Sequence, residues 1–348
     1  MDVKLSPSFL TRRRLLSTGA AGLCLPAVVR AESSRHVQDM FGTDVAVPDA
    51  PLRIADLWFA HNEIVTMLGA GSRIRVTVDG PDEFPWLYRI ASGLKDAHLV
   101  HPAGLNPEML IAAGIQLAFT STEQQALPLR AAGIPTMAMA FQDMSGLLKS
   151  LAITADVINT PLARDRAASW TSELKQLSTL LNARLASVPM EKRPRVLHLI
   201  RLSPVAFDGG HSIIGEWITQ AGGINVAAAV SGTKRTTTIE QVAAWDPDII
   251  IVQGGVTLPP EGAAPPGWEM LRAVKEGRVI SNPFGMFPWD RYGTEFLLQL
   301  RWAARMFHPD LFSDIDLRSE TSRFYRTFFD CSLSGDEVSQ ILSGHLPS

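Results

Sequence analysis

The longest regular pattern of apolar positions lies in the middle of the chain, between residues 160 and 188. Thr160 is a favourable N-cap, and Pro161 suits the first turn of a helix, where its missing N–H costs nothing. Apolar residues then recur in steps of three and four, which places them on one stripe of a helix: Ala163, Ala167, Trp170, Leu174, Leu177, Leu181, Leu185 and Val188. At about 1.5 Å per residue the pattern predicts one helix of roughly 40 Å, longer than the average globular helix.

The segments on either side of this predicted helix resemble each other. In the N-terminal half, the strand-like RIADLW precedes a helix that ends in LGAG and then NPEMLIAAGIQLAFT. In the C-terminal half, RVLHLI precedes a helix that ends in QAGG and then TIEQVAAWDPDIIIV. Near-continuous apolar runs such as DIIIV are typical of parallel strands that helices cover on both faces. We therefore predict an α/β fold with two Rossmann-like lobes of mainly parallel sheet, residues 32–159 and 189–348, joined by a single long helix, 160–188. The C-terminal lobe includes further helices at the end of the chain.

The first 31 residues have the pattern of an export signal. A basic cluster, Arg12 to Arg14, precedes an uncharged stretch from Ser17 to Val29 and a small residue at Ala31. This order predicts a twin-arginine-type signal that is too short to form a permanent membrane anchor. We expect an exported, periplasmic protein that acts as a monomer, and the sequence leaves open whether the signal is cleaved after Ala31.

Composition excludes several classes of protein. The formal charge is −3, and the predicted signal contains five of the 32 Lys and Arg residues, so the remaining chain is more acidic and is a poor candidate for nucleic-acid binding. Of two cysteines, only Cys331 lies outside the signal, which excludes an intrachain disulfide and a cysteine-based metal site there.

Motifs for common catalytic sites are also absent from the sequence. No G-x-S-x-G, H-E-x-x-H, P-loop or G-x-G-x-x-G segment follows a predicted strand, so we assign no catalytic residues and no cofactor. We expect a binding protein rather than an enzyme. An exported α/β enzyme stays as an alternative, which a Ser/His/Asp or metal site converging in the cleft would support.

Candidate ligand residues follow the predicted strands, because ligands bind at the carboxyl ends of parallel strands. In the N-terminal lobe, Trp58, Phe59 and His61 follow strand 52–57, and Trp86 lies in the turn-rich segment 80–90. The aromatic residues could equally belong to the core or to a lobe interface. His61 is a weaker candidate because a hydrogen-bonded histidine is commoner than a ligand.

The C-terminal lobe supplies a second set of candidates. The end of strand 195–201 supplies Arg201, Phe207 and His211, and a proline-rich loop ends at Trp268. The segment 282–293 is the densest cluster, with the candidates Phe287, Trp289 and Arg291. It could simply cap the helix that follows, but its charged residues add polar specificity to an aromatic wall. Arginine can hold anionic oxygens in bidentate fashion, which favours Arg201 and Arg291 as ligand residues.

The order and spacing of several of these segments resemble the periplasmic substrate-binding proteins of ABC importers for iron–siderophore complexes and cobalamin. The segments that carry the resemblance are RIADLW with LGAG, NPEMLIAAGIQLAFTS with RAAGIPTMAM, QAGGINVAA, TIEQVAAWDPDIIIVQ and WEMLRAVKEGRVISNP. The resemblance implies two lobes bridged by one long helix. It does not select the ligand, and we expect a metal chelate, with a ferric siderophore as the first candidate. Cobalamin, heme and a metal ion such as nickel are alternative ligands. A bare metal ion would use His61 and His211, which are the only candidates for direct metal ligands.

The resemblance also implies a partner, an ABC permease dimer with its ATPase. Members of the family use one glutamate in each lobe to meet arginines of the permease, and the motif positions here are Glu108 and Glu240. Each residue is also a favourable carboxylate at a helix start, so one alone would indicate little.

Overall fold

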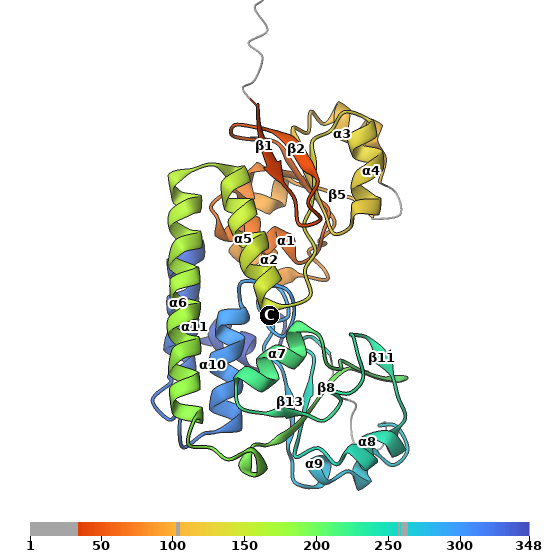
Figure 1. The fold of residues 1–348 in the computed structure, drawn as a ribbon, viewed down its shortest axis with the longest axis vertical. Helices are drawn as coiled ribbons and strands as arrows, with labels where there is room; N and C mark the ends of the chain where they lie inside the picture. The colour runs from red at the N-terminus through yellow and green to blue at the C-terminus, as the bar shows by residue number, and fades with distance from the viewer. Residues whose placement is uncertain (1–33, 102–104, 257, 259–263, 348) are drawn as a thin grey trace, which may run out of the picture. The chain divides into compact units, whose positions relative to one another are not determined.

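The computed structural model describes residues 34–101, 105–256, 258 and 264–347. The predicted export signal, residues 1–31, lies outside this part of the chain. The residues from Ser33 onward form one unit, in which two α/β lobes are joined by the helix α6 (Pro161–Leu185). This arrangement confirms the predicted fold class, and Figure 1 shows the N-terminal lobe and the C-terminal lobe at opposite ends of α6.

The sheet of the N-terminal lobe is entirely parallel, with the strand order β5-β4-β3-β6-β7. Its strands are β3 (Ile54–Asp56), β4 (Ile74–Thr77), β5 (His98–Leu99), β6 (Leu117–Thr120) and β7 (Thr136–Ala138). Its helices are α1 (His61–Met67), α2 (Pro85–Ile90), α3 (Pro107–Ala112), α4 (Glu123–Ala131) and α5 (Met144–Ile158). Buried side chains of β6 alternate between two apolar clusters, Phe119 on one face and Ala118 on the other, as expected for a sheet covered on both faces.

A short hairpin precedes this sheet, made of β1 (Ser34–Gln38) and β2 (Asp44–Pro48) in antiparallel register. The sequence pattern does not predict this hairpin. Its buried residues include Val37, Val45 and Val47, and Val45 and Val47 show the alternation of a strand with one buried face. Each strand has only five residues, so the alternation is too brief to stand out in the sequence. The strand β4 and the helix α2 were also missed, because each is only a few residues long.

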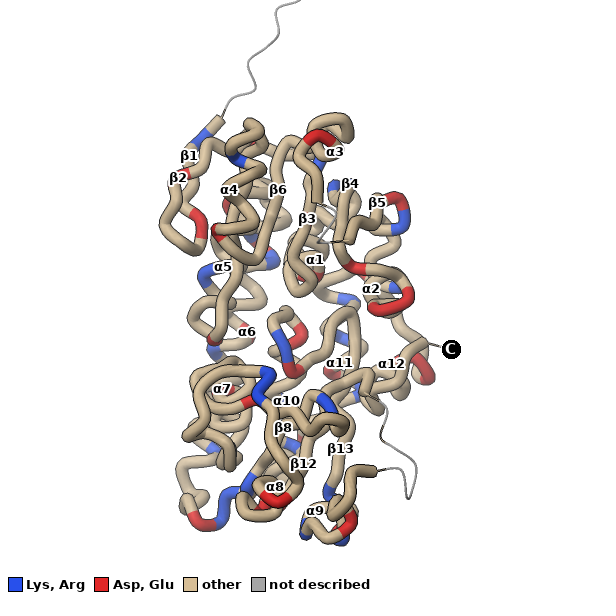
Figure 2. Tube along the Cα trace, turned by 90° about the vertical axis from the view of Figure 1, so that its right-hand side faces the viewer, with Lys and Arg blue, Asp and Glu red and all other residues tan. Residues whose placement is uncertain are grey.

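The sheet of the C-terminal lobe has the order β11-β9-β8-β12-β13, with β10 also paired to β8. The pairs of β8 with β10 and β12, and of β12 with β13, are parallel, whereas β9 and β11 add an antiparallel edge. The strands are β8 (Arg195–Leu202), β9 (Val205–Phe207), β10 (Ile224–Asn225), β11 (Arg235–Thr236), β12 (Ile249–Val252) and β13 (Val279–Ser281). The helices are α7 (Ile213–Gln220), α8 (Ile239–Trp245), α9 (Arg272–Lys275), α10 (Phe296–Phe307), α11 (Leu317–Phe329) and α12 (Gly335–Leu342). Figure 2 shows β3, β4 and β6 above and β8, β12 and β13 below, with the loops that follow these strands between the two sheets.

The long helix α6 has the stripe that the sequence predicts. The Thr160 side chain accepts a hydrogen bond from the N–H of Ala163 at 3.1 Å, and the apolar residues from Ala163 to Leu185 on the stripe are buried. One charged residue, Arg166, is buried with them, where it donates to Asp330 at 2.5 Å and to the carbonyl of Met67 at 3.1 Å. Of the helices in the described residues, none combines the length and the apolar character that a membrane span needs.

Candidate functional site: the interlobe cleft

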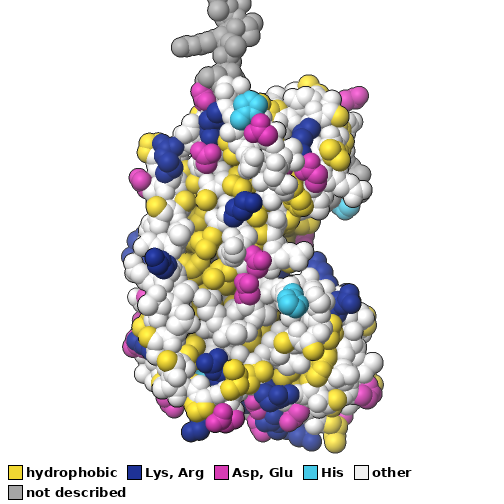
Figure 3. All heavy atoms as spheres, viewed as in Figure 1, with side chains coloured by type: hydrophobic (Ala, Val, Ile, Leu, Met, Phe, Trp, Pro, Cys, Tyr) yellow, Lys and Arg dark blue, Asp and Glu magenta, His cyan; other side chains and the backbone are white. Residues whose placement is uncertain are grey.

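A cavity of about 560 Å³ lies between the two lobes, within the size range of small-molecule sites. Both lobes line it through loops that follow the carboxyl ends of their strands: Trp58, Phe59 and Ala60 after β3, Asp82, Glu83 and Phe84 after β4, Gln253, Gly254, Gly255 and Val256 after β12, and Phe284, Phe287, Pro288, Arg291 and Tyr292 after β13. Lys234 and Leu346 complete the lining. Figure 3 shows the surface hollowed between the lobes, on the side away from α6.

Aromatic rings from both lobes form one wall of this cavity. Phe84 of the N-terminal lobe stacks on Phe287 of the C-terminal lobe, with 5.3 Å between the ring centroids. The ring centroid of Phe59 lies 6.1 Å from that of Phe84. The ring centroids of Trp58 in the N-terminal lobe and Tyr292 in the C-terminal lobe lie 6.3 Å apart. Stacked rings of this kind offer a large apolar face to an organic ligand.

Arg291 is the cation at the centre of the polar wall. Its side chain is buried, with the residue 5% exposed, and it donates from Nε to Gln253 Oε1 at 2.9 Å and from Nη2 to Asp208 Oδ2 at 2.8 Å. Among the described residues, its Nη1 has no hydrogen-bond partner. The guanidinium therefore has a fixed orientation, and it keeps one buried nitrogen without a partner. Guanidinium groups commonly recognise anionic oxygens.

A row of buried polar side chains continues behind Arg291. His198 of β8 lies between two carboxylates, with Nδ1 at 2.9 Å from Asp208 Oδ2 and Nε2 at 2.5 Å from Asp290 Oδ2. All three side chains are fully buried. Burial opposes the charge on His198, but the two carboxylates outweigh it and raise the pKa of the imidazole above its ordinary value. Burial likewise opposes ionisation of Asp208, but His198 and Arg291 lower the pKa of this carboxyl far below its usual range.

Asp208 also connects to Lys234, the second cation of the cavity. Its Oδ1 accepts the backbone N–H of Lys234 at 3.0 Å, and Lys234 has a left-handed backbone with φ of 56°. The same carboxylate thus binds Arg291 through one oxygen and the backbone of Lys234 through the other. The opposite wall is acidic, with the exposed Asp82 and Glu83.

The structure brings four of the predicted ligand residues to the cavity: Trp58, Phe59, Phe287 and Arg291. It places the others elsewhere. Trp86 is buried and donates from its indole N–H to the carbonyl of His345 at 2.9 Å, and Trp289 and Trp268 belong to apolar clusters. Phe207 packs edge-on against Trp245 with ring centroids 5.0 Å apart, and Arg201 is exposed, with its Nε donating to the carbonyl of Pro204.

The two histidines considered as metal ligands lie apart. His61 is fully buried, with Nδ1 at 2.9 Å from Asp56 Oδ2 and Nε2 at 2.9 Å from the hydroxyl of Thr154. The Thr154 hydroxyl donates to the carbonyl of Ser150, so it accepts from His61 and fixes the ring. His211 is exposed and lines a different cavity. Within the described residues, no three His, Cys, Asp or Glu side chains converge to hold a metal ion.

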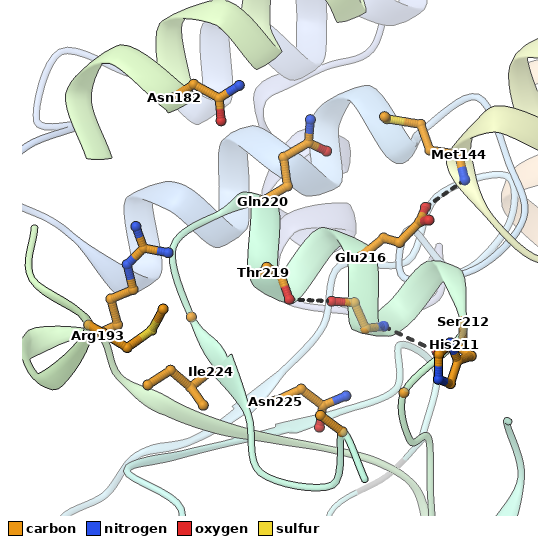
Figure 4. A pocket seen from close by; sticks show the side chains of 15 residues that line it. Met144, Asn182, Arg193, His211, Ser212, Glu216, Thr219, Gln220, Ile224 and Asn225 are labelled. Atoms are coloured by element: carbon orange, nitrogen blue, oxygen red, sulfur yellow. Dashed lines mark hydrogen bonds between the residues drawn. The ribbon is translucent and has the colours of Figure 1, made fainter. Parts of the chain in front are cut away.

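That second cavity, of about 810 Å³, lies beside α7 and includes Met144, Asn182, Arg193 and His211 in its lining (Figure 4). Glu216 of α7 reaches across it and accepts the backbone N–H of Met144, the first residue of α5, at 2.6 Å. The side chains around the cavity have mixed character, and this hydrogen bond links the two lobes at its rim.

Sequence reasoning missed Phe84, Tyr292, Lys234 and Gln253 as lining residues. Gln253 follows the apolar strand β12 directly, so its position at a carboxyl end was a usable signal. Lys234 precedes the edge strand β11, which the sequence pattern did not reveal.

Glu108 and Glu240 occupy corresponding places in the two lobes. Each lies in the first turn of a short helix, α3 or α8, and each is exposed. The Asn106 side chain caps α3 by accepting the N–H of Glu108 at 2.9 Å, and Thr238 caps α8. A hydrogen bond from Thr238 lowers the pKa of Glu240, so it stays ionised at neutral pH.

The model of a protein family described as periplasmic binding protein matches residues 103–284, which is more than half of the chain. The chain belongs to this periplasmic binding protein family. The resemblance inferred from the sequence is confirmed.

Individual relatives agree with this assignment. The binding protein is 28% identical over 163 residues to the molybdate-binding protein MolA of Haemophilus influenzae, and the match spans 46% of each chain, less than half the length of that curated relative. A periplasmic solute-binding protein of Veillonella parvula superposes with a TM-score of 0.76 at 24% identity, covering 89% of this chain and 97% of that one. The structure of MolA bound to molybdate superposes with a TM-score of 0.75 at 21% identity, covering 86% of this chain and 99% of that one. Helicobacter pylori CeuE with Ni(II) bound superposes with a TM-score of 0.71 at 16% identity, covering 88% of this chain and 99% of that one. At these identities the structures show a shared fold.

Proposed function

We propose that this binding protein captures an anionic metal chelate, with a ferric siderophore as the first candidate, and delivers it to an ABC permease and its ATPase. The observation that carries the proposal is the position of Arg291, a guanidinium fixed by Gln253 and Asp208 that lines a cavity walled by aromatic rings of both lobes. The proposal places the protein in the periplasm, in agreement with its family.

The two walls of the cavity suit two parts of one ligand. Rings of Phe59, Phe84 and Phe287 would cover the organic chelator, whereas Arg291 and Lys234 would meet the anionic oxygens around the metal. A volume of about 560 Å³ suits a ligand larger than a single ion.

A metal oxyanion is the second candidate, because the matched relative MolA is described as molybdate-binding. A small tetrahedral anion would use Arg291 and Lys234 but would leave most of the aromatic wall unused. Cobalamin, heme and a nickel ion complete the set of alternatives from the family resemblance, and a nickel ion would need ligands other than the separated His61 and His211.

Titration of the purified protein with a panel of ligands tests the proposal. Fluorescence of Trp58 in the cavity wall provides the signal, and the panel contains ferric tris-catecholate, ferric citrate, molybdate, cobalamin, heme and Ni(II)-histidine. We expect the ferric catecholate to bind most tightly and molybdate weakly or not at all. Tight binding of molybdate alone would replace the chelate by an oxyanion, and binding of none would overturn the proposal.

The partner is proposed from Glu108 and Glu240. Two exposed carboxylates at matching positions of the two lobes, connected through the rigid helix α6, form a pair of negative points for a permease dimer with basic pockets. Charge pairs at an interface mainly govern encounter and orientation.

A further inference from the structure

Two carboxylates, Asp208 and Asp290, are buried behind Arg291, and one arginine can balance the charge of only one of them. Asp208 contacts Arg291 directly, whereas Asp290 lies on the far side of the His198 ring and has no arginine or lysine partner among the described residues. A buried carboxylate without a compensating charge is costly, so the charge of His198 decides whether this cluster is neutral.

The contacts of His198 fit a ring that donates from both nitrogens. Asp208 is ionised, since it also accepts from Arg291 and from the Lys234 backbone, and therefore it accepts from Nδ1. Asp290 Oδ2 lies at 2.5 Å from Nε2, a short contact, and hydrogen bonds between ionised partners are the shorter ones in proteins. An imidazole that donates from both nitrogens is an imidazolium.

Within the described part of the chain, the other contacts of the His198 ring are with uncharged groups. Trp217 of α7 packs edge-on with ring centroids 6.0 Å apart and donates from its indole N–H to the carbonyl of Asp290. On β12 the residue paired with His198 is Ile251. The titratable or charged groups that face the ring are therefore Asp208 and Asp290, with Arg291 behind Asp208.

We infer that His198 is a positioning residue of the ligand site: as an imidazolium it neutralises Asp290, so that the cluster behind Arg291 carries no net negative charge against an anionic ligand. This inference rests on the proposed function, because it concerns the affinity of the cleft for an anion. Loss of the proton would leave two buried carboxylates against one arginine and would repel an anionic ligand. Affinity therefore declines as pH rises through the range in which the imidazolium loses its proton.

A charge-balance rescue tests this at pH 7.5, with ferric tris-catecholate as the first probe and molybdate as the second. His198→Gln keeps a polar side chain without the charge, and we expect it to weaken binding by roughly tenfold, which corresponds to about 1.4 kcal/mol. The double variant His198→Gln with Asp290→Asn removes one charge of each sign, and we expect it to recover most of the lost affinity. A purely structural role of His198 predicts the reverse, a double variant as weak as the single one or weaker.

Two further measurements accompany the rescue. Nitrogen-15 NMR of the ligand-free protein, with the His198 signals identified by their loss in His198→Gln, should show both ring nitrogens protonated at pH 7.5. In Asp290→Asn the His198 ring should lose one of its two N–H protons at a lower pH than it does in the wild-type protein. His308→Gln serves as the control, because His308 is buried outside the cleft and contacts the carbonyl of Gly222.

The outcomes separate this inference from the proposed function. A wild-type protein that binds neither probe would overturn the proposed function and the inference with it. Wild-type binding that is unchanged in His198→Gln, or a His198 ring that is neutral at pH 7.5, would overturn the inference alone.

Discussion

Glu63 of α1 and Glu295 at the start of α10 meet in the protein interior, where Glu63 Oε1 accepts the backbone N–H of Glu295 at 2.9 Å. Both side chains are buried. Glu295 in turn accepts the N–H groups of Met286 and Phe287 at 2.9 and 3.0 Å and the hydroxyl of Tyr325. Two carboxyl groups thus hold the N-terminal lobe to the segment before α10, with no arginine or lysine among their partners in the described residues.

This pair predicts that stability falls as pH rises. Burial raises the pKa of Glu295 to about 7, and burial together with the nearby Glu295 raises the pKa of Glu63 well above its usual range. The folded protein therefore binds these protons more tightly than the unfolded chain, so the contribution is complete below about pH 4.5 and is lost as pH rises through 7. We expect Glu63→Gln to reduce the decline in unfolding free energy between pH 5 and 8 by roughly 1–3 kcal/mol.

Urea denaturation at both pH values measures this effect. The exposed Glu276→Gln is the matched control and should leave the pH dependence unchanged. An identical decline in wild type and Glu63→Gln would contradict the role assigned to the pair.

Gly293 allows Glu63 to approach the backbone. A Cβ at this position would overlap Glu63 Oε2, so Gly293→Ala must push the carboxyl group away from Thr294 and Glu295. We expect a loss of about 1–3 kcal/mol, as for other overpacked interiors, seen as a lower Tm. Gly335→Ala, at an exposed glycine where an added Cβ would make only an ordinary contact of 3.4 Å with Arg318 Nη2, should change Tm little, and equal Tm values for both variants would refute the argument.

Arg291 and Arg201 provide a matched pair for the ligand site. Arg291 lines the cavity, whereas Arg201 is exposed and lies outside the cavity lining. We expect Arg291→Gln to weaken binding of ferric tris-catecholate by about 2–4 kcal/mol, because a fixed guanidinium is lost, and Arg201→Gln to have no measurable effect. Isothermal titration of both variants checks this, and equal affinities would remove Arg291 from the site.

Phe287 and Trp289 are two residues apart but lie in different surroundings. Phe287 faces the cavity and stacks on Phe84, whereas Trp289 is 1% exposed in the core. Phe287→Ala should therefore lower ligand affinity with little change in Tm. Trp289→Ala should cost about 3–5 kcal/mol of stability, measured by denaturation. A stable Trp289→Ala variant with impaired binding would show that Trp289 acts as a ligand residue after all.

Glu108 and Glu240 should matter for transport and not for capture of the ligand. We expect Glu108→Arg with Glu240→Arg to keep the affinity for ferric tris-catecholate but to reduce uptake and permease-stimulated ATP hydrolysis strongly, since like charges would meet. The control is Glu191→Arg with Glu276→Arg, two exposed glutamates outside the helix starts α3 and α8. Full transport by the Glu108 and Glu240 variant would reject docking through these residues.

The sequence alone determined the architecture because the relevant patterns are local and long. Eight apolar positions in steps of three and four predict α6, and seven of them are buried. The apolar run of β12 predicts a strand covered on both faces, and its side chains do alternate between two clusters. The rule that ligands bind at the carboxyl ends of parallel strands selected Trp58, Phe59 and Arg291 from the sequence, and all three line the cavity.

Only the tertiary structure decided which neighbouring side chain faces the ligand. Phe287 and Trp289 share one loop, and the direction of each depends on the path of that loop and on Phe84, which is some two hundred residues away in sequence. His198 looks like an ordinary residue of an apolar strand, and its significance arises because Asp208 and Asp290 converge on it from two other loops. Charge balance in a buried cluster depends on such long-range convergence, and no local pattern in the sequence encodes it.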